Sequence, residues 1–123
     1  MGGKGKTYFI DIDGTIVPYL TNVELDNMIP MNTCEEQLLP GVKELWGTFS
    51  NEDIIVMTTA RCERHRQFTE KIFSDNNLVY SHLIMDLTNG PRILINDTPD
   101  MFYKKAIAVN VRRNGGFYFK QKK

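Results

Sequence analysis

The segment from residue 9 to residue 15 sets the strongest limit on the structure and chemistry of this chain. It reads Phe-Ile-Asp-Ile-Asp-Gly-Thr and places Asp11 and Asp13 two residues apart at the end of an apolar run. Side chains at positions i and i+2 of a strand point to the same side, and two neighbouring carboxylates repel unless a cation or a shared proton lies between them. A strand that runs into an Asp-Gly turn explains Asp13 and Gly14 but not Asp11. The segment therefore predicts a charged site at the end of a buried strand.

Length and charge favour one ordinary globular domain. A chain of 123 residues can bury a core of its own, and its 15 basic and 15 acidic side chains cancel, so no global field attracts nucleic acid or a membrane. Cys34 and Cys62 match no metal-binding spacing, and we expect neither a membrane span nor a signal peptide. We expect a single cytoplasmic domain over residues 1–123, with 1–5 as a lead-in and 114–123 as a tail.

Five strand-like apolar runs recur along the chain, at residues 8–12, 54–58, 82–85, 93–95 and 106–111. Several are continuous rather than alternating, which is typical of strands buried on both faces of a parallel sheet. Helical spacing of apolar residues predicts helices over about 42–49 and 63–74, and a short helix is expected near 23–28. The alternation of strands and helices indicates an α/β fold.

Polar residues follow three of the expected strands. Asp11 and Asp13 end the first strand, a Thr-Thr-Ala-Arg sequence at 58–61 ends the second, and Asn96 and Asp97 end the fourth. In open α/β sheets, ligands bind beyond the carboxyl ends of the strands. We therefore expect these side chains to form one site.

These residues make the chain resemble the haloacid dehalogenase superfamily of phosphotransferases. The resemblance implies a single Rossmann-like three-layer α/β domain with a five-stranded parallel sheet, ordered 5-4-1-2-3, and helices on both faces. Core elements fill the intervals between the motifs, so the chain resembles a member without a cap domain. Specificity would then come from residues 17–39, from the residues after Thr59 or from a partner subunit.

The resemblance also implies roles for the strand-end residues. Asp11 would be the nucleophile that becomes an aspartyl phosphate, and Asp13 the general acid and base. Thr59 and the backbone amide of Ala60 would hold phosphate, with Thr58 as the alternative to Thr59.

A magnesium site follows from the same resemblance. Asp97 would supply an acidic ligand after the fourth strand, beside the Asp11 carboxylate and the backbone carbonyl of Asp13. Oxygen ligands of this kind suit Mg²⁺, which removes the repulsion between a carboxylate and a phosphate. Asp100 could assist this site.

The family also has a basic residue, usually Lys, that holds phosphate. Its equivalent in this chain is not obvious, because no Lys occurs between positions 72 and 95. Arg92 is the candidate, with a solvated Arg at a strand edge as the alternative. Lys71, within a predicted helix, is a poorer choice. Arg61 and His65 are candidates for contact with the rest of a substrate, whereas Arg64 and Arg66 fit a solvated helical face.

The leading functional prediction is a Mg²⁺-dependent phosphomonoesterase that acts on a small phosphorylated metabolite, either a sugar phosphate or a nucleotide. One alternative is a phosphatase acting on polynucleotide ends or a phosphoprotein, and the basic last dozen residues are the sole feature that favours nucleic acid. Another is a non-catalytic binding or regulatory domain, against which the intact Asp11 and Asp13 argue. We expect no membrane partner. The sequence is compatible with an oligomer as well as with a monomer.

Overall fold

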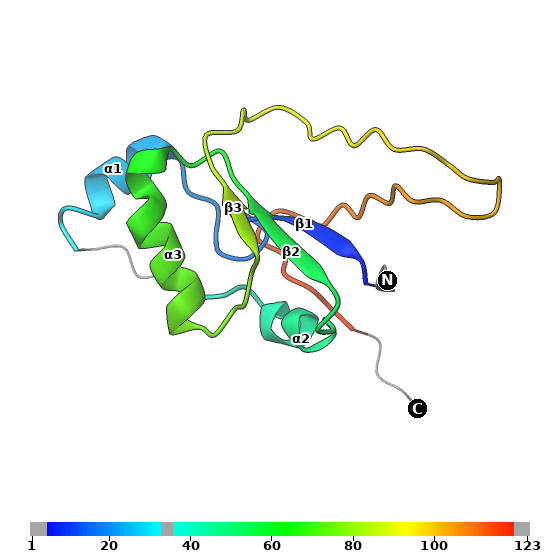
Figure 1. Cartoon of the computed structure of the whole chain (residues 1–123). Helices are drawn as coiled ribbons and strands as arrows, with labels where there is room; N and C mark the ends of the chain where they lie inside the picture. The colour runs from blue at the N-terminus through cyan, green and yellow to red at the C-terminus, as the bar shows by residue number, and fades with distance from the viewer. Residues whose placement is uncertain (1–4, 33–35, 120–123) are drawn as a thin grey trace.

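The computed structural model describes residues 5–32 and 36–119, which form a small α/β domain (Figure 1). Its elements in chain order are β1 Thr7–Asp11, α1 Asn22–Met28, α2 Val42–Gly47, β2 Ile54–Thr58, the 3₁₀ turn η1 Glu63–His65, α3 Arg66–Asp75 and β3 His82–Ile84. Both crossovers between strands therefore contain helix, as parallel pairing requires.

The sheet has three parallel strands in the order β1-β2-β3. Asp11 is in register with Thr58, and Thr58 is in register with Ile84, so all three strands end at the same level. At this common edge, each of the three strands is followed by a loop that carries polar residues.

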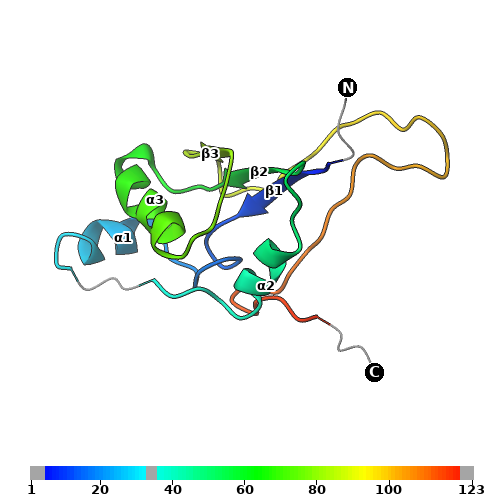
Figure 2. The same cartoon turned by 60° about the horizontal axis from the view of Figure 1, so that its bottom comes forward.

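The core lies between the sheet and the helices, which cover one face of the sheet (Figure 2). Ile10 of β1 and Met57 of β2 pack in one cluster with Val42 of α2 and Phe73 of α3. On the other face Phe9 remains 57% exposed. Side chains of β1 therefore alternate between the helix-covered face and the exposed face of the sheet, as the two-residue period of a strand dictates.

The predicted five-stranded sheet with helices on both faces is wrong, because the sheet has three strands. Residues 93–95 and 106–111 contain no strand and belong instead to an outer segment, residues 93–111, which runs out from the sheet and back (Figure 1). Ile93 and Ile95 are 82% and 90% exposed there.

Connection length explains this error. A parallel strand pair needs a crossover of about a dozen or more residues, usually helical. The connections at 85–92 and 96–105 are shorter than that, contain no helix, and carry Pro91 and Pro99. Apolar runs identified segments suited to strands, but they did not show whether the chain could bring those segments back into the sheet.

Local sequence signals account for where the helices begin. Thr21 caps α1 by accepting a hydrogen bond from the backbone N–H of Glu24, while the Glu24 carboxylate accepts one from the Thr21 backbone N–H. This reciprocal capping box satisfies donors that a helix start leaves free. Gly41 precedes α2 with a φ of 81°, and a Cβ there would lie 2.0 Å from the carbonyl oxygen of Phe117.

Candidate active site at the carboxyl edge of the sheet

A tight turn directly after β1 carries Asp13. The carbonyl of Ile12 accepts hydrogen bonds from the backbone N–H groups of Thr15, Ile16 and Val17, and the Gly14 N–H donates to the Val17 carbonyl at 2.7 Å. Gly14 has a φ of 84°, a conformation that a residue with a Cβ rarely adopts. The glycine therefore lets the chain reverse at once and keeps Asp13 at the sheet edge.

Asp11, the last residue of β1, has a half-exposed carboxylate. The Thr15 hydroxyl donates a hydrogen bond to its Oδ2 at 3.2 Å, and Nη2 of Arg92 lies 3.9 Å from its Oδ1. Burial raises the pKa of Asp11, while the Thr15 hydrogen bond and the Arg92 charge oppose that rise. The half-exposed carboxyl group of Asp11 is therefore accessible to a ligand from solvent, next to a cation.

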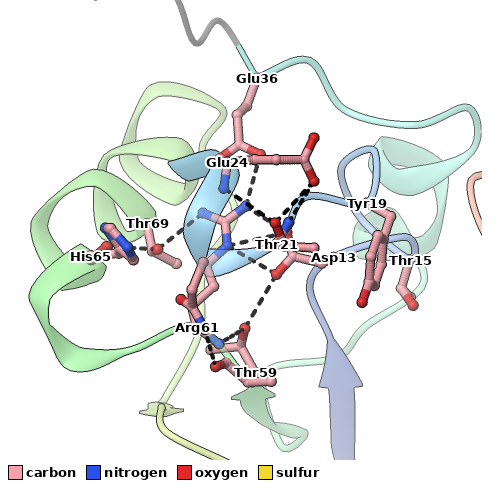
Figure 3. A network of polar contacts seen from close by, with 12 residues as sticks. Asp13, Thr15, Tyr19, Thr21, Glu24, Glu36, Thr59, Arg61, His65 and Thr69 are labelled. Atoms are coloured by element: carbon pink, nitrogen blue, oxygen red, sulfur yellow. Dashed lines mark hydrogen bonds and ion pairs between the residues drawn. The ribbon is translucent and has the colours of Figure 1, made fainter. Parts of the chain in front are cut away.

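Asp13 is held by the guanidinium group of Arg61 (Figure 3). Nη2 of Arg61 donates to Oδ1 of Asp13 at 2.9 Å, and Nε donates to Oδ2 at 3.0 Å. The side chain of Arg61 is 1% exposed and that of Asp13 is 11% exposed. A forked, buried contact of this kind binds Asp13 as a carboxylate anion.

Arg61 also joins two further side chains. Nη2 donates to Oε2 of Glu36 at 2.8 Å, and Nη1 donates to the hydroxyl of Thr69 at 3.1 Å (Figure 3). Burial acts against the Arg61 charge, but its hydrogen bonds to Asp13 and Glu36 outweigh this and raise the pKa of the guanidinium. Burial raises the pKa of Glu36, whose Oε1 has no hydrogen-bond partner among the described residues.

The structure distinguishes the two threonines at the end of β2. The hydroxyl of Thr58 donates to the backbone carbonyl of Ile10 and so belongs to the sheet. The hydroxyl of Thr59, fully buried, lies 3.5 Å from Oδ2 of Asp13 and accepts the backbone N–H of Arg61 at 3.0 Å. Thr59 is therefore the residue that faces the Asp13 carboxylate.

Asn22, at the start of α1, braces the loop that contains Ala60. Its Nδ2 donates to the Ala60 carbonyl at 3.1 Å, and its Oδ1 accepts the backbone N–H of Cys62 at 2.9 Å. Neither Asn22 nor Glu36 was predicted as a site residue, because both lie in the stretch between β1 and α2, where no sequence motif indicates a functional site. The capping box next to Asn22 was the one local signal available there.

Arg92 reaches Asp11 from the chain that follows β3. Its Nη1 donates to the backbone carbonyls of Thr88 and Gly90 at 2.8 and 2.9 Å, which fixes the guanidinium near the sheet edge. The same loop is anchored to the end of β2, since the Leu87 N–H donates to the Thr59 carbonyl. Asp11, Asp13, Thr59 and Arg92 are thus brought together.

Asp97 is not brought to this group. Its carboxylate is 74% exposed on the outer segment, where Lys105 lies 3.9 Å away. Asp100, in the same segment, accepts the backbone N–H groups of Phe102 and Tyr103. Within residues 5–32 and 36–119, no cluster of three or more His, Cys, Asp or Glu side chains could hold a metal ion.

The Asp11 carboxylate nevertheless suits Mg²⁺ in chemical kind. Mg²⁺ takes hard oxygen ligands, usually one or two carboxylates together with waters and substrate phosphate oxygens. A half-exposed carboxylate at an open sheet edge meets that description, and Asp13 is already engaged by Arg61. Asp11 is therefore the residue that would hold the ion in this arrangement.

His65 and Arg64 both contact Asp26 of α1. The His65 side chain is buried, and its Nε2 is 3.0 Å from Oδ1 of Asp26, which also accepts hydrogen bonds from Arg64. Arg66 pairs with Glu63. The described contacts thus tie His65 to α1 and not to Asp11 or Asp13.

Comparisons with protein-family models, curated proteins and solved structures found no match for this chain. Over the described part of the chain, no helix combines the length and the apolar character needed to cross a membrane.

Proposed function

We propose that this protein is a Mg²⁺-dependent phosphomonoesterase that acts through an aspartyl phosphate on a small phosphorylated metabolite. The observation that carries the proposal is the meeting of Asp11, Asp13, Thr59 and Arg92 at one edge of the sheet. A nucleophile, a second carboxylate, a hydroxyl donor and a guanidinium are the groups that phosphoryl transfer needs.

In the first step, an Oδ of Asp11 bonds to phosphorus and the bond to the leaving oxygen breaks. Asp13 has to be protonated for this step, and the leaving oxygen takes that proton. Arg92 offers donors to the phosphoryl oxygens, whose charge grows in the transition state, and the buried Thr59 hydroxyl would have to turn from Asp13 to reach them. Mg²⁺ held by Asp11 would supply charge neutralisation between the carboxylate and the phosphate.

In the second step, Asp13 accepts a proton from a water molecule, whose oxygen bonds to phosphorus as the bond to Asp11 breaks. Inorganic phosphate leaves, and both carboxyl groups return to their starting states. The contact with Arg61 stabilises the Asp13 anion, so it opposes this proton transfer and makes Asp13 a weaker base than a free carboxylate. Protonated Asp13 would lose or weaken one of its Arg61 contacts, because the oxygen that carries the proton becomes a donor and a poorer acceptor.

This last point favours a second candidate, a phosphate-binding domain without turnover. Such a domain would keep Asp13 permanently locked by Arg61, and Asp97 would stay on the outer segment. It would bind phosphate esters through Arg92 and Thr59 but would release them unchanged.

Turnover of aryl and alkyl phosphates with Mg²⁺ separates the two candidates. We expect activity that EDTA abolishes and Mg²⁺ restores. Asp11→Asn should keep the fold, measured by circular dichroism, and reduce turnover to background, because the amide cannot attack phosphorus. Asp13→Asn should cost about a hundred- to ten-thousandfold with alkyl phosphates and less with aryl phosphates, which need little protonation of the leaving oxygen.

Asp75→Asn provides the matched control. Asp75 ends α3, where its carboxylate pairs with Lys71, so the variant should retain wild-type turnover. Inactive wild type across a broad panel, with phosphate esters still bound, would favour the binding domain. Wild-type turnover in Asp11→Asn would refute the mechanism.

A further inference from the structure

A loop far along the chain packs against the turn that carries Asp13. The Asn114 backbone N–H donates to the Gly14 carbonyl at 2.8 Å, and Oδ1 of Asn114 accepts the Tyr19 N–H at 2.7 Å across 95 positions. Asn114 has a φ of 61°, so the loop is bent sharply at this point. These bonds hold residues 111–116 beside the catalytic turn.

Arg113 lies at the contact between the loop and the turn. Its Cζ is 3.9 Å from the centre of the Tyr19 ring, which makes a cation–π contact. Its Cγ is 3.0 Å from the place where a Cβ on Gly14 would lie. Tyr19 follows Thr15 along the catalytic loop (Figure 3), so the Arg113 side chain is held next to the residues that flank Asp13.

Arg112 and Arg113 are adjacent and exposed. Among the described residues, no carboxylate lies within ion-pair distance of Arg112 or Arg113, whereas Arg61, Arg64, Arg66 and Arg92 all have carboxylate neighbours. Both line a cavity of about 430 Å³ together with the rest of residues 111–116 and Tyr118. An exposed guanidinium that stacks on an aromatic ring keeps its N–H groups free for an anion.

We propose that Arg112 and Arg113 form a second anion subsite beside the phosphate position, so that the preferred substrate carries a second phosphate or a carboxylate. The inference rests on the proposed function, because it takes the Asp11 and Asp13 edge as the place of reaction. Arg113 would bind the second anion while its position is fixed by Tyr19, and Arg112 would add charge from the cavity wall.

Three aryl substrates test the subsite: phenyl phosphate, 4-carboxyphenyl phosphate and 1,4-phenylene bisphosphate. Wild type should show a higher kcat/KM for the substrates with a second anion, and the two such substrates distinguish a carboxylate from a phosphate. Arg113→Gln should lower kcat/KM for the preferred one by about tenfold to a hundredfold more than for phenyl phosphate, the range of a lost charged hydrogen bond. Arg113→Lys should restore part of the preference.

Arg64→Gln is the control, since Arg64 is an exposed arginine already paired with Asp26 on α1. It should leave the ratio between substrates unchanged. Calorimetric binding to Asp11→Asn gives a readout that needs no turnover: the bisphosphate should bind more tightly than phenyl phosphate, and adding Arg113→Gln should remove the difference. Turnover without any Arg113-dependent preference overturns the subsite alone, whereas an Arg113-dependent binding preference without turnover overturns the catalytic proposal alone.

Discussion

At the scale of single residues, the structure is dominated by one buried cation shared by two carboxylates. Arg61 contacts both Asp13 and Glu36, so this cluster carries one positive and up to two negative charges with little access to water. A buried ion pair adds little to stability over apolar packing, but removing one partner leaves an uncompensated charge. The cluster therefore makes the position of Asp13 depend strongly on Arg61.

Replacing Arg61 tests that dependence. Arg61→Met keeps much of the side-chain length but leaves Asp13 and Glu36 without their donor, and it should reduce the free energy of unfolding by about 3–5 kcal/mol. Urea unfolding measures this loss. Arg64→Met, which removes an exposed arginine paired with Asp26, should change stability little. Equal effects of the two variants would contradict the assignment of Arg61 as the structural centre.

Glu36 should make stability depend on pH with a defined sign. Burial raises its pKa in the folded state, so the folded state favours the protonated form. Its contribution to stability is then fully present below the unfolded pKa and is lost as pH rises through the folded pKa. Glu36→Gln, which cannot ionise, should therefore gain stability relative to wild type as pH rises from about 4 to 7, measured by urea unfolding at each pH.

The control for Glu36 has the opposite sign. The Arg66 hydrogen bond lowers the pKa of Glu63, so its contribution is present above the unfolded pKa and is lost as pH falls. Glu63→Gln should lose stability relative to wild type as pH rises over the same range. Parallel pH profiles for wild type and Glu36→Gln would show that Glu36 does not titrate differently in the folded state.

At the scale of elements, the sequence predicted β1, β2 and β3 to within one residue at each end, and also the helices that join them. These segments combine apolar periodicity with a connection of suitable length. The runs at 93–95 and 106–111 have the composition of strands, but their connections are too short and contain prolines. Composition identifies a segment that can form a strand. Whether that segment pairs also depends on a connection long enough to return it to the sheet.

The candidate site was predictable to a similar degree. Asp11, Asp13 and Thr59 follow from strand ends, because parallel strands bring their carboxyl ends to one edge. The fork from Arg61 to Asp13 was not predictable, since Arg61 was expected to face a substrate and is instead 1% exposed. Glu36 and Asn114 reach the site from loops, and no periodic pattern indicates where a loop residue will lie.

At the scale of the whole molecule, the outer segment differs from the rest of the described chain. Within residues 5–32 and 36–119, the hydrogen bonds and ion pairs that its side chains make join two of its own residues, as between Lys105 and Asp97. Ile93, Ile95 and Phe102 are largely exposed. Local stability follows from buried apolar contacts, so this segment should open at far lower free energy than the sheet.

Limited proteolysis should reveal that difference. Trypsin should cleave first after Lys104 or Lys105, which lie exposed on the outer segment, because a protease needs an extended and accessible backbone. Lys43 and Lys71 lie within α2 and α3, whose helical backbone should resist cleavage longer. Mass spectrometry of the early fragments identifies the site, and Lys104→Gln with Lys105→Gln should slow the first cut. Early cleavage after Lys43 or Lys71, with Lys104 and Lys105 intact, would mean that the outer segment is better protected than the helices.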